Sequence, residues 1–267
     1  MEIQGLCKTY SQARWWWRQS QFGVRALQDV DLVLKTGTTL ALVGESGSGK
    51  TTLAMCLVGL EQPDAGDIRF EGKSVVGLGR RKRMAALQNI QLIFQDSAGA
   101  LNPFMSAAEI IEEPLRIRGH EHKKERAERS VEAMEQVGLS LRWKDRRPSE
   151  LSGGQRQRLA IARGLVLKPR LLILDEAVSG LDLSIQGQIM NLLLDLQAAQ
   201  GLSYLYISHN LDVVSRISDE VAIIHEGRIV EHGRPSEVLA SAQHTYPQVP
   251  WPAILTQKSA CRAHSGA

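Results

Sequence analysis

Short apolar runs recur along the chain, and each is followed directly by polar residues. They are Thr39–Val43, Ile90–Phe94, Leu171–Leu174 and Tyr204–Ser208. Nearly unbroken runs of this length, rich in leucine and β-branched residues, predict strands that are buried on both faces of a parallel sheet. Helical patterns lie between several of them, so we expect an α/β architecture. Ligands of such sheets bind outside the carboxyl ends of the strands, which is where these runs deliver their polar residues.

The stretch between the second and third runs has a different character. It is charged and helix-forming, most clearly over Lys123–Val137, and it predicts a helical subdomain inserted into the sheet domain. After the last run, Val221–Val230 predicts a hairpin that turns at Glu226 and Gly227. We therefore expect one domain with these parts: a core with a β subdomain at 1–96 and 156–244, a helical subdomain at 97–155, and a loosely ordered tail at 245–267.

Composition narrows the class of protein. The chain has 267 residues, 43% of them hydrophobic and 23% charged, as in an ordinary soluble protein. Its net charge of +3 is too small to indicate a nucleic-acid partner. The start lacks the features of a signal peptide, and no apolar run approaches the roughly 18–20 residues that span a bilayer. Cys7, Cys56 and Cys261 are isolated, which predicts neither a disulfide framework nor a metal site. We expect a cytoplasmic chain whose membrane role, if it has one, comes through a partner.

A glycine-rich loop follows the first run. Gly44–Thr51 fits the pattern G-x-x-x-x-G-K-[ST], in which backbone N–H groups and the positive end of the next helix bind phosphates. Lys50 is expected to bridge the β- and γ-phosphates, and Thr51 to bind Mg²⁺. A chance glycine turn is the alternative, but the strand before it and the helical pattern after it argue against that. The candidate ATP-binding residues of this loop are Gly44, Glu45, Ser46, Gly47, Ser48, Gly49, Lys50, Thr51 and Thr52.

Two adjacent carboxylates follow the third run. Asp175 and Glu176 would repel each other unless a cation shared the site, so Asp175 is the candidate Mg²⁺ ligand. Glu176 is the candidate general base that polarises the attacking water. Seen alone, such a pair is as compatible with a helix cap. The glycine loop at the same sheet edge favours the catalytic interpretation.

Other candidates are weaker when taken singly. Gln95 follows the second run and could bind Mg²⁺ and water; His209 follows the fourth and could hydrogen-bond the γ-phosphate. The alternatives are an ordinary loop glutamine and a structural histidine. Tyr10 could stack on adenine, or it could be a partly buried strand tyrosine. Trp15–Trp17, flanked by arginines, could contact headgroups or a partner, or pack in a hairpin; the sequence leaves this open.

A second phosphate-binding device occurs in the same chain. Leu151–Gln155 reads LSGGQ and precedes a helical pattern. Two such devices suggest that one is lent to a second copy or partner, so that ATP is held between two chains. The candidate residues here are Ser152, Gly153, Gly154 and Gln155.

These segments together resemble the ATPases of ABC transporters, from near residue 1 to about residue 240. In that family's terms Tyr10 matches the adenine-stacking position, Gln95 the Q-loop and His209 the switch histidine. Gly44–Thr51 matches Walker A, and Leu171–Glu176 matches Walker B. Leu151–Gln155 matches the signature motif, and Leu181-Asp182 the D-loop. The resemblance implies a P-loop NTPase (RecA-like) core with an N-terminal antiparallel β subdomain and an inserted α-helical subdomain. It also implies that ATP and Mg²⁺ are bound.

Further segments are similar to the dipeptide, oligopeptide and nickel importers. They are Phe94–Ser97, Ala100–Pro103, Asp175–Ser179 and Leu181–Gln186. The chain looks like the second ATPase type of those importers, since it lacks the C-terminal cysteine cluster of the companion type. Ala177-Val178 replaces the commoner Pro-Thr or Pro-Val, and the tail diverges after Pro247.

The resemblance also implies partners and a cellular location. The chain is expected to pair with a second ATPase beneath two permeases, at the cytoplasmic face of the membrane. An extracytoplasmic solute-binding protein would belong to the same complex. Specificity would lie in those partners, so the solute, whether peptide, nickel or metal chelate, stays open. The alternative is an ATPase of a soluble multi-enzyme complex such as one that degrades phosphonates. A regulator without turnover is disfavoured because Glu176 and His209 are both present.

Overall fold

The computed structural model describes residues 1–10, 23–94, 99–119, 122–178 and 180–238. The predictions made for Gln95, for Trp15–Trp17 and for the tail at 245–267 lie outside these ranges. All other candidate residues fall within them.

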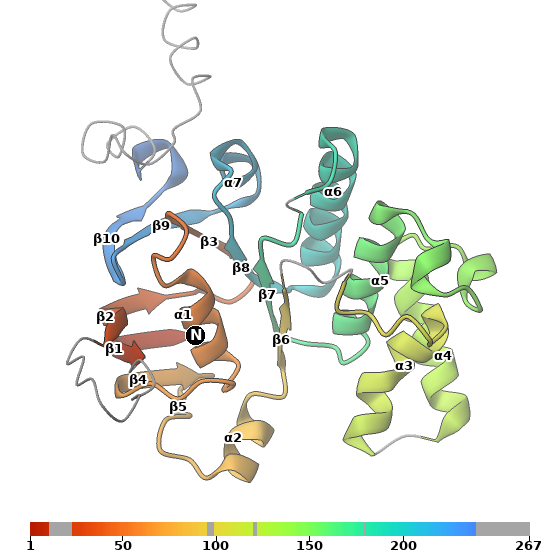
Figure 1. Cartoon of the computed structure of the whole chain (residues 1–267), viewed down its shortest axis with the longest axis horizontal. Helices are drawn as coiled ribbons and strands as arrows, with labels where there is room; N and C mark the ends of the chain where they lie inside the picture. Colours follow the sequence, from red (N-terminus) through yellow and green to blue (C-terminus); the bar gives the residue numbers. More distant parts are fainter. Residues whose placement is uncertain (11–22, 95–98, 120–121, 179, 239–267) are drawn as a thin grey trace, which may run out of the picture.

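A six-stranded sheet forms the centre of the molecule, in the order β10-β9-β3-β8-β7-β6 (Figure 1). Neighbouring strands from β9 to β6 run parallel, and β10 is antiparallel to β9. The four predicted strands are confirmed, with ends that shift by at most one residue. The strands are β3 (Thr39–Val43), β6 (Ile90–Ile93), β7 (Leu171–Asp175), β8 (Ser203–Ile207), β9 (Glu220–His225) and β10 (Arg228–Gly233).

Both faces of this sheet are covered, as the nearly unbroken apolar runs predicted. Alternate residues of each strand enter different cores. In β3, Ala41 and Val43 belong to one apolar cluster, and Leu40 and Leu42 to the other. The first cluster lies beneath the helices that follow β6, and the second lies beneath a smaller antiparallel sheet.

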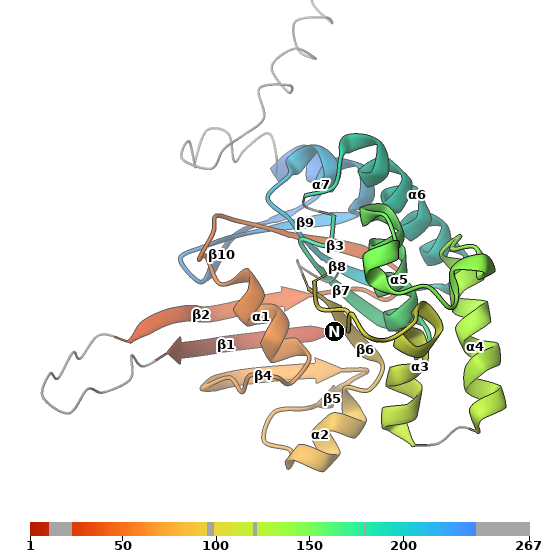
Figure 2. The same cartoon turned by 45° about the vertical axis from the view of Figure 1, so that its right-hand side comes forward.

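The smaller sheet has the order β2-β1-β4-β5, and its pairs are antiparallel. Its strands are β1 (Glu2–Tyr10), β2 (Val24–Val33), β4 (Ala65–Phe70) and β5 (Lys73–Ser74). Helix α1 (Lys50–Leu57) contributes its buried face to the core shared by the two sheets (Figure 2). This is the antiparallel β subdomain that the resemblance implied.

Helices α3, α4 and α5 pack against one another on the opposite side of β6 from the antiparallel sheet (Figures 1 and 2). Arg163 of α5 donates to Glu113 of α3 at 2.8 Å. The helix predicted over Lys123–Val137 is confirmed as α4. Because α5 runs to Leu165, the helical group continues past residue 155, and the division there stays a prediction. The helices are α2 (Arg80–Ala86), α3 (Ala107–Arg118), α4 (Lys123–Gln136), α5 (Gly153–Leu165), α6 (Leu183–Gln200) and α7 (Leu211–Ile217), with 3-10 turns at Leu141–Trp143 and Pro148–Glu150.

The predicted hairpin is β9–β10. Its two-residue loop has φ of 45° at Glu226 and 78° at Gly227, the left-handed pair of a type I′ turn. The tip of this hairpin reaches the glycine loop, because the Gly227 N–H donates to Ser48 O at 3.0 Å. It also reaches β2, where the Gln28 N–H donates to Gly227 O at 2.8 Å.

Candidate functional site

The carboxyl ends of β3, β7 and β8 bring the candidate residues to one edge of the sheet. The Thr51 hydroxyl, at the start of α1, donates to Asp175 Oδ2 at 2.9 Å. The Glu176 N–H, just after β7, donates to Ile207 O of β8 at 2.9 Å. His209 Nδ1 lies 3.1 Å from Glu176 Oε1. Residues from three separate strand ends therefore form one continuous polar cluster.

The glycine loop is shaped by close backbone contacts. A Cβ on Gly44 would lie 2.3 Å from Ile224 O, and one on Gly49 would lie 2.3 Å from Ala26 O. Neither position can therefore carry a side chain. Gly47 has φ of 81°, but a Cβ there would meet nothing within 4 Å. The loop is thus packed from behind and open in front.

Lys50 lies inside this loop. Its ammonium donates to Gly44 O at 2.8 Å and to Glu45 O at 2.6 Å, and its side chain is buried. Burial lowers the pKa of Lys50, while the carboxylates of Glu176 and Asp175 oppose that shift. The first turn of α1 carries no acidic residue, so the positive end of the helix has no anionic side chain of its own there. A buried cation, a helix N-terminus and an open glycine turn together fit a phosphate group.

The oxygen atoms of Thr51 and Asp175 fit a hard divalent cation. Asp175 is only 5% exposed, and burial raises its pKa, against the effect of the Thr51 hydrogen bond. The neighbouring Glu176 raises that pKa further. A cation would relieve this unfavourable burial of negative charge. Mg²⁺ commonly binds through one or two protein oxygens plus phosphates and water, and this pair offers such a partial ligand set.

Glu176 and His209 form a second unit. The Glu176 side chain is 17% exposed and that of His209 60%, so the carboxylate is sheltered and the imidazole faces outward. Glu176 has φ of 48°, a left-handed conformation that is costly for a non-glycine residue. Such strain is common at functional sites. The arrangement suits a carboxylate that takes a proton from water and an imidazole that orients it.

The LSGGQ turn lies elsewhere. This turn leads into α5, and both views place α5 across β6 from α1 (Figures 1 and 2). Ser152 caps the helix: Gln155 N donates to its Oγ at 3.3 Å, and Ser152 N donates to Gln155 Oε1 at 2.9 Å. A Cβ on Gly154 would lie 2.9 Å from Ile185 Cγ2. The structure therefore brings the glycine loop, the carboxylates and His209 together, and keeps the LSGGQ turn apart.

Tyr10 ends β1 and is exposed at 37%. The Lys8 ammonium lies 5.5 Å from the centre of its ring, a cation–π contact. More than half of the surface of Tyr10 is therefore covered, so the interpretation as a partly buried strand tyrosine stays open beside base stacking. An exposed ring suits base stacking, which stays a prediction.

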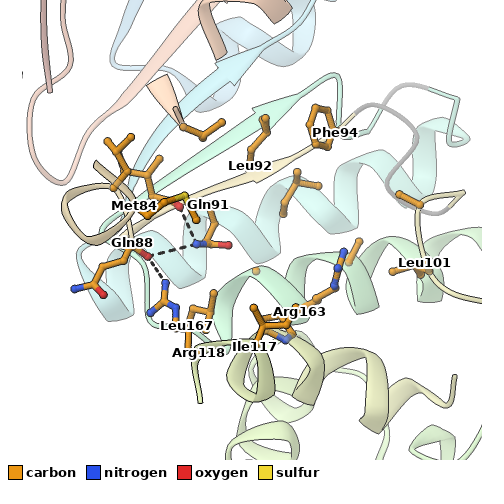
Figure 3. A pocket seen from close by; sticks show the side chains of 18 of the residues that line it. Met84, Gln88, Gln91, Leu92, Phe94, Leu101, Ile117, Arg118, Arg163 and Leu167 are labelled. Atoms are coloured by element: carbon orange, nitrogen blue, oxygen red, sulfur yellow. Dashed lines mark hydrogen bonds between the residues drawn. The ribbon is translucent and has the colours of Figure 1, made fainter. Parts of the chain in front are cut away.

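A groove that the sequence did not reveal opens between β6 and α2 on one side and α3 and α5 on the other (Figure 3). Its volume is about 610 Å³. Met84 and Ile117 on its lining are 63% and 77% exposed, and Arg118 donates to Gln88 O across it. Exposed apolar residues on charged helices were the only sequence signal, and they became meaningful only when two elements faced each other.

The profile of the ABC transporter family matches residues 27–179. The chain belongs to this family. The chain therefore has the α/β fold of the ABC cassettes and is an ATPase.

Curated relatives of this ABC protein match over most of its length. A probable peptide ABC transporter ATP-binding protein of Sinorhizobium fredii is 42% identical over 92% of this chain and 70% of that protein. The dipeptide transport ATP-binding protein DppF of Escherichia coli K12 is 44% identical over 84% of this chain and 67% of that one. The glutathione import ATP-binding protein GsiA of Escherichia coli O6:H1 is 48% identical over 84% of this chain, which covers 36% of GsiA.

Solved structures agree. A dimeric ATP-binding cassette in a post-hydrolysis state, bound to ADP and Pi, superposes with a TM-score of 0.76 at 26% identity, over 88% of this chain and 98% of that one. CbiO1 of Clostridium perfringens, part of the ABC transporter complex cbiONQ, gives a TM-score of 0.77 at 28% identity, over 93% and 96%. In the described part of our ABC protein, no helix is long and apolar enough to cross a membrane.

Proposed function

We propose that this chain is the ATPase subunit that energises a peptide importer. The observation that carries the proposal is the pair Glu176 and His209, 3.1 Å apart at the sheet edge beside the glycine loop, on a chain 44% identical to a dipeptide transport ATP-binding protein. Nickel and metal chelates, which the sequence also left open, become outcomes of the test below.

In this proposal the phosphates of ATP occupy the open front of the glycine loop. Lys50, now held by two backbone carbonyls, redirects its N–H groups to the β- and γ-phosphate oxygens. Thr51 and Asp175 hold Mg²⁺, with Gln95 as a further ligand. The metal supplies charge neutralisation for the transferred phosphoryl group. Tyr10 stacks on the adenine.

Glu176 accepts the proton of the attacking water, and His209 orients that water toward the γ-phosphate. Both groups are carried on strand ends and not on a long loop, which keeps the distance between them defined. Hydrolysis then yields ADP and phosphate.

The LSGGQ turn serves a partner. Because Ser152–Gln155 lies across β6 from its own glycine loop, it is available to the ATP of a second ATPase. That partner, two permeases and an extracytoplasmic solute-binding protein complete the proposed complex at the cytoplasmic face of the membrane. The groove of Figure 3 separates the core from the helical group and is suited to receive a permease segment. Closure of the ATPase pair would then move that segment.

The experiment is affinity purification of the chain from its native membranes in mild detergent, followed by mass spectrometry. We expect two polytopic permeases and a second ATPase, together with ATPase activity that Glu176→Gln in this subunit reduces at least about 100-fold. Recovery of soluble enzymes alone would overturn the transport proposal and support a soluble complex. If nickel or a metal chelate stimulates ATP turnover and peptides do not, the transported solute is the metal or its chelate and not a peptide.

A further inference from the structure

The ammonium of Lys8 is held in place by the segment that follows α1. Its Nζ donates to Gln62 O at 2.7 Å and lies 3.4 Å from Glu61 Oε2 and 3.7 Å from Asp64 Oδ1. The Lys8 side chain is only 13% exposed, whereas lysines usually extend into solvent. Burial lowers the pKa of this ammonium, but the hydrogen bond to Glu61 and the charge of Asp64 outweigh that effect and raise it. Lys8 therefore carries a positive charge whose position is defined by its partners.

The same segment fixes the end of β1 around Lys8. The Thr9 N–H donates to Asp64 Oδ2 at 2.6 Å, and the Asp64 N–H donates to Cys7 O at 2.8 Å. Asp64 thus bonds to the strand residues on both sides of Lys8. The segment comes after α1, which begins directly after the glycine loop. The cation is therefore tied both to the strand that ends in Tyr10 and to the segment that continues from the phosphate-binding helix.

The Tyr10 ring lies against this cation. Lys8 Nζ stands over the ring at 5.5 Å from its centre, within the roughly 6 Å over which a cation and an aromatic face attract each other. Tyr10 is 37% exposed at the end of β1, where a tyrosine side chain can otherwise adopt more than one rotamer. A ring has two faces, and the cation takes only one of them. The contact therefore selects one orientation of the ring, and the second face remains for stacking.

We propose that Lys8 is a positioning residue for ATP binding: its ammonium holds one face of the Tyr10 ring, so that the other face is oriented for the adenine base before the nucleotide arrives. The inference rests on the proposed function, in which Tyr10 stacks on the adenine. Lys8 acts through that ring and contacts neither the nucleotide nor the reacting atoms. Ordering a free side chain on binding lowers affinity several-fold, so a ring that is ordered in advance raises the affinity for ATP.

The test replaces Lys8 by methionine in the purified complex, which keeps the apolar stem and removes the charge. We expect Lys8→Met to raise KM for ATP about 3- to 10-fold, the effect of ordering one side chain on binding, with kcat unchanged. Lys8→Arg keeps a cation over the ring and should restore most of the wild-type KM. Inorganic tripolyphosphate has no base, so calorimetry should give it the same affinity for Lys8→Met as for the wild type.

Lys35→Met is the matched control. Lys35 also pairs with a glutamate, Glu220, but it lies beyond the end of β2, whose other end pairs with Tyr10 at Val24. This variant should leave KM for ATP unchanged. An increase in KM like that of Lys8→Met would overturn the inference, because loss of any lysine ion pair would then have the same effect.

A double-mutant cycle with Tyr10→Ala tests the route through the ring. The double variant should bind ATP no more weakly than Tyr10→Ala alone, and additive losses would overturn the route. A wild-type KM in Lys8→Met would overturn the inference. Equal weakening of ATP and tripolyphosphate would also overturn it, because Lys8 would then support the whole site and not the base. If Tyr10→Ala itself leaves KM unchanged, the stacking role in the proposed function is wrong, whatever Lys8 does.

Discussion

Several side chains at the sheet edge are placed at a cost to the fold. Asp175 is buried beside Glu176, and among the described residues the donor bonded to its Oδ2 is the neutral hydroxyl of Thr51. Burial raises its pKa, which means that the folded protein disfavours the charged form. A cation bound to the Asp175 carboxylate would offset this cost.

Asp175→Asn should therefore stabilise the nucleotide-free protein. The amide is easier to bury, and its carbonyl still accepts from Thr51, so we expect the free energy of unfolding to rise by about 1 kcal/mol. ATPase activity should fall at least about 100-fold. Because the folded-state pKa of Asp175 is raised, the charge penalty is full at neutral pH and fades as pH falls toward the ordinary value of 3.8. Urea unfolding at several pH values measures this; a variant that is less stable at neutral pH would contradict it.

The glycines offer a second test at this scale. Gly47 and Gly37 have φ of 81° and 73°, and a Cβ on either would meet nothing within 4 Å. Each Gly→Ala change should cost about 1–2 kcal/mol through backbone strain alone. Only Gly47→Ala fills the open front of the phosphate loop, so only it should weaken ATP binding, by at least about tenfold. Titration with a fluorescent ATP analogue compares the two; equal affinities would remove Gly47 from the site.

Single residues also mark the limit of sequence reasoning. Lys50, Asp175 and Glu176 could be singled out because motif and strand end coincide. The hydrogen bond that the Tyr204 hydroxyl donates to Leu193 O of α6 could not be predicted, because its partner lies on another element. Which hydroxyl finds a partner depends on the helix above it and not on the pattern along the strand.

Helices α3 and α5 begin with the same device. Ser106 and Ser152 each accept from the backbone N–H three residues on at 3.3 Å, and the residue at that position bonds back to the cap. Such capping boxes satisfy two helix N–H groups that would otherwise lack partners. The two boxes match in geometry, and the residue that bonds back is Glu109 in α3 and Gln155 in α5.

Ser106→Ala and Ser152→Ala should each destabilise the protein by about 1 kcal/mol, through loss of the cap. ATPase activity of the complex should fall markedly only for Ser152→Ala, because that hydroxyl is proposed to bind the partner's ATP. Thermal unfolding and steady-state turnover of both variants give the comparison. Equal activities would show that Ser152 is a helix cap and nothing more.

Elements buried on both faces could be predicted well. The strands β3, β6, β7 and β8 could be predicted because most of their residues are apolar. The β9–β10 hairpin could be predicted because Glu226-Gly227 stands between two strand-like segments. The groove between α2 and α3 could not be predicted. Its width depends on the distance between β6 with α2 and the helices α3 and α5, and the sequence of neither part specifies that distance.

At the scale of the whole molecule, carboxylates with lowered pKa values occur in each main part of the fold. Asp67 in the antiparallel sheet, Glu109 and Glu150 in the helical group and Glu220 in the main sheet all have lowered pKa values. The causes are hydrogen bonds: to Ser74 for Asp67, to backbone N–H groups for the two glutamates at helix starts, and to Lys35 for Glu220.

These shifts predict an acid-sensitive fold. A carboxylate whose folded-state pKa is lowered adds stability above its unfolded value, and that stability is lost as pH falls through the folded value. The free energy of unfolding should therefore decline below about pH 4.5, the ordinary glutamate value. Because Glu109 and Glu150 are exposed to solvent, 1 M salt should weaken the effect. Circular dichroism during acid titration measures it; a stability that is flat from pH 6 to about pH 3 would contradict it.

The contact of the hairpin tip with the glycine loop has a consequence for biosynthesis. Gln28 Nε2 bonds to Glu226 O, 198 positions along the chain, and Gly227 N bonds to Ser48 O. The ribosome synthesises the glycine loop long before the β9–β10 hairpin that packs against it. The growing chain thus carries its phosphate motif long before anything holds that motif in shape. We expect a nascent chain that stops before Glu220 to leave ATP unbound, and ATP binding to arise only after the β9–β10 hairpin has been made.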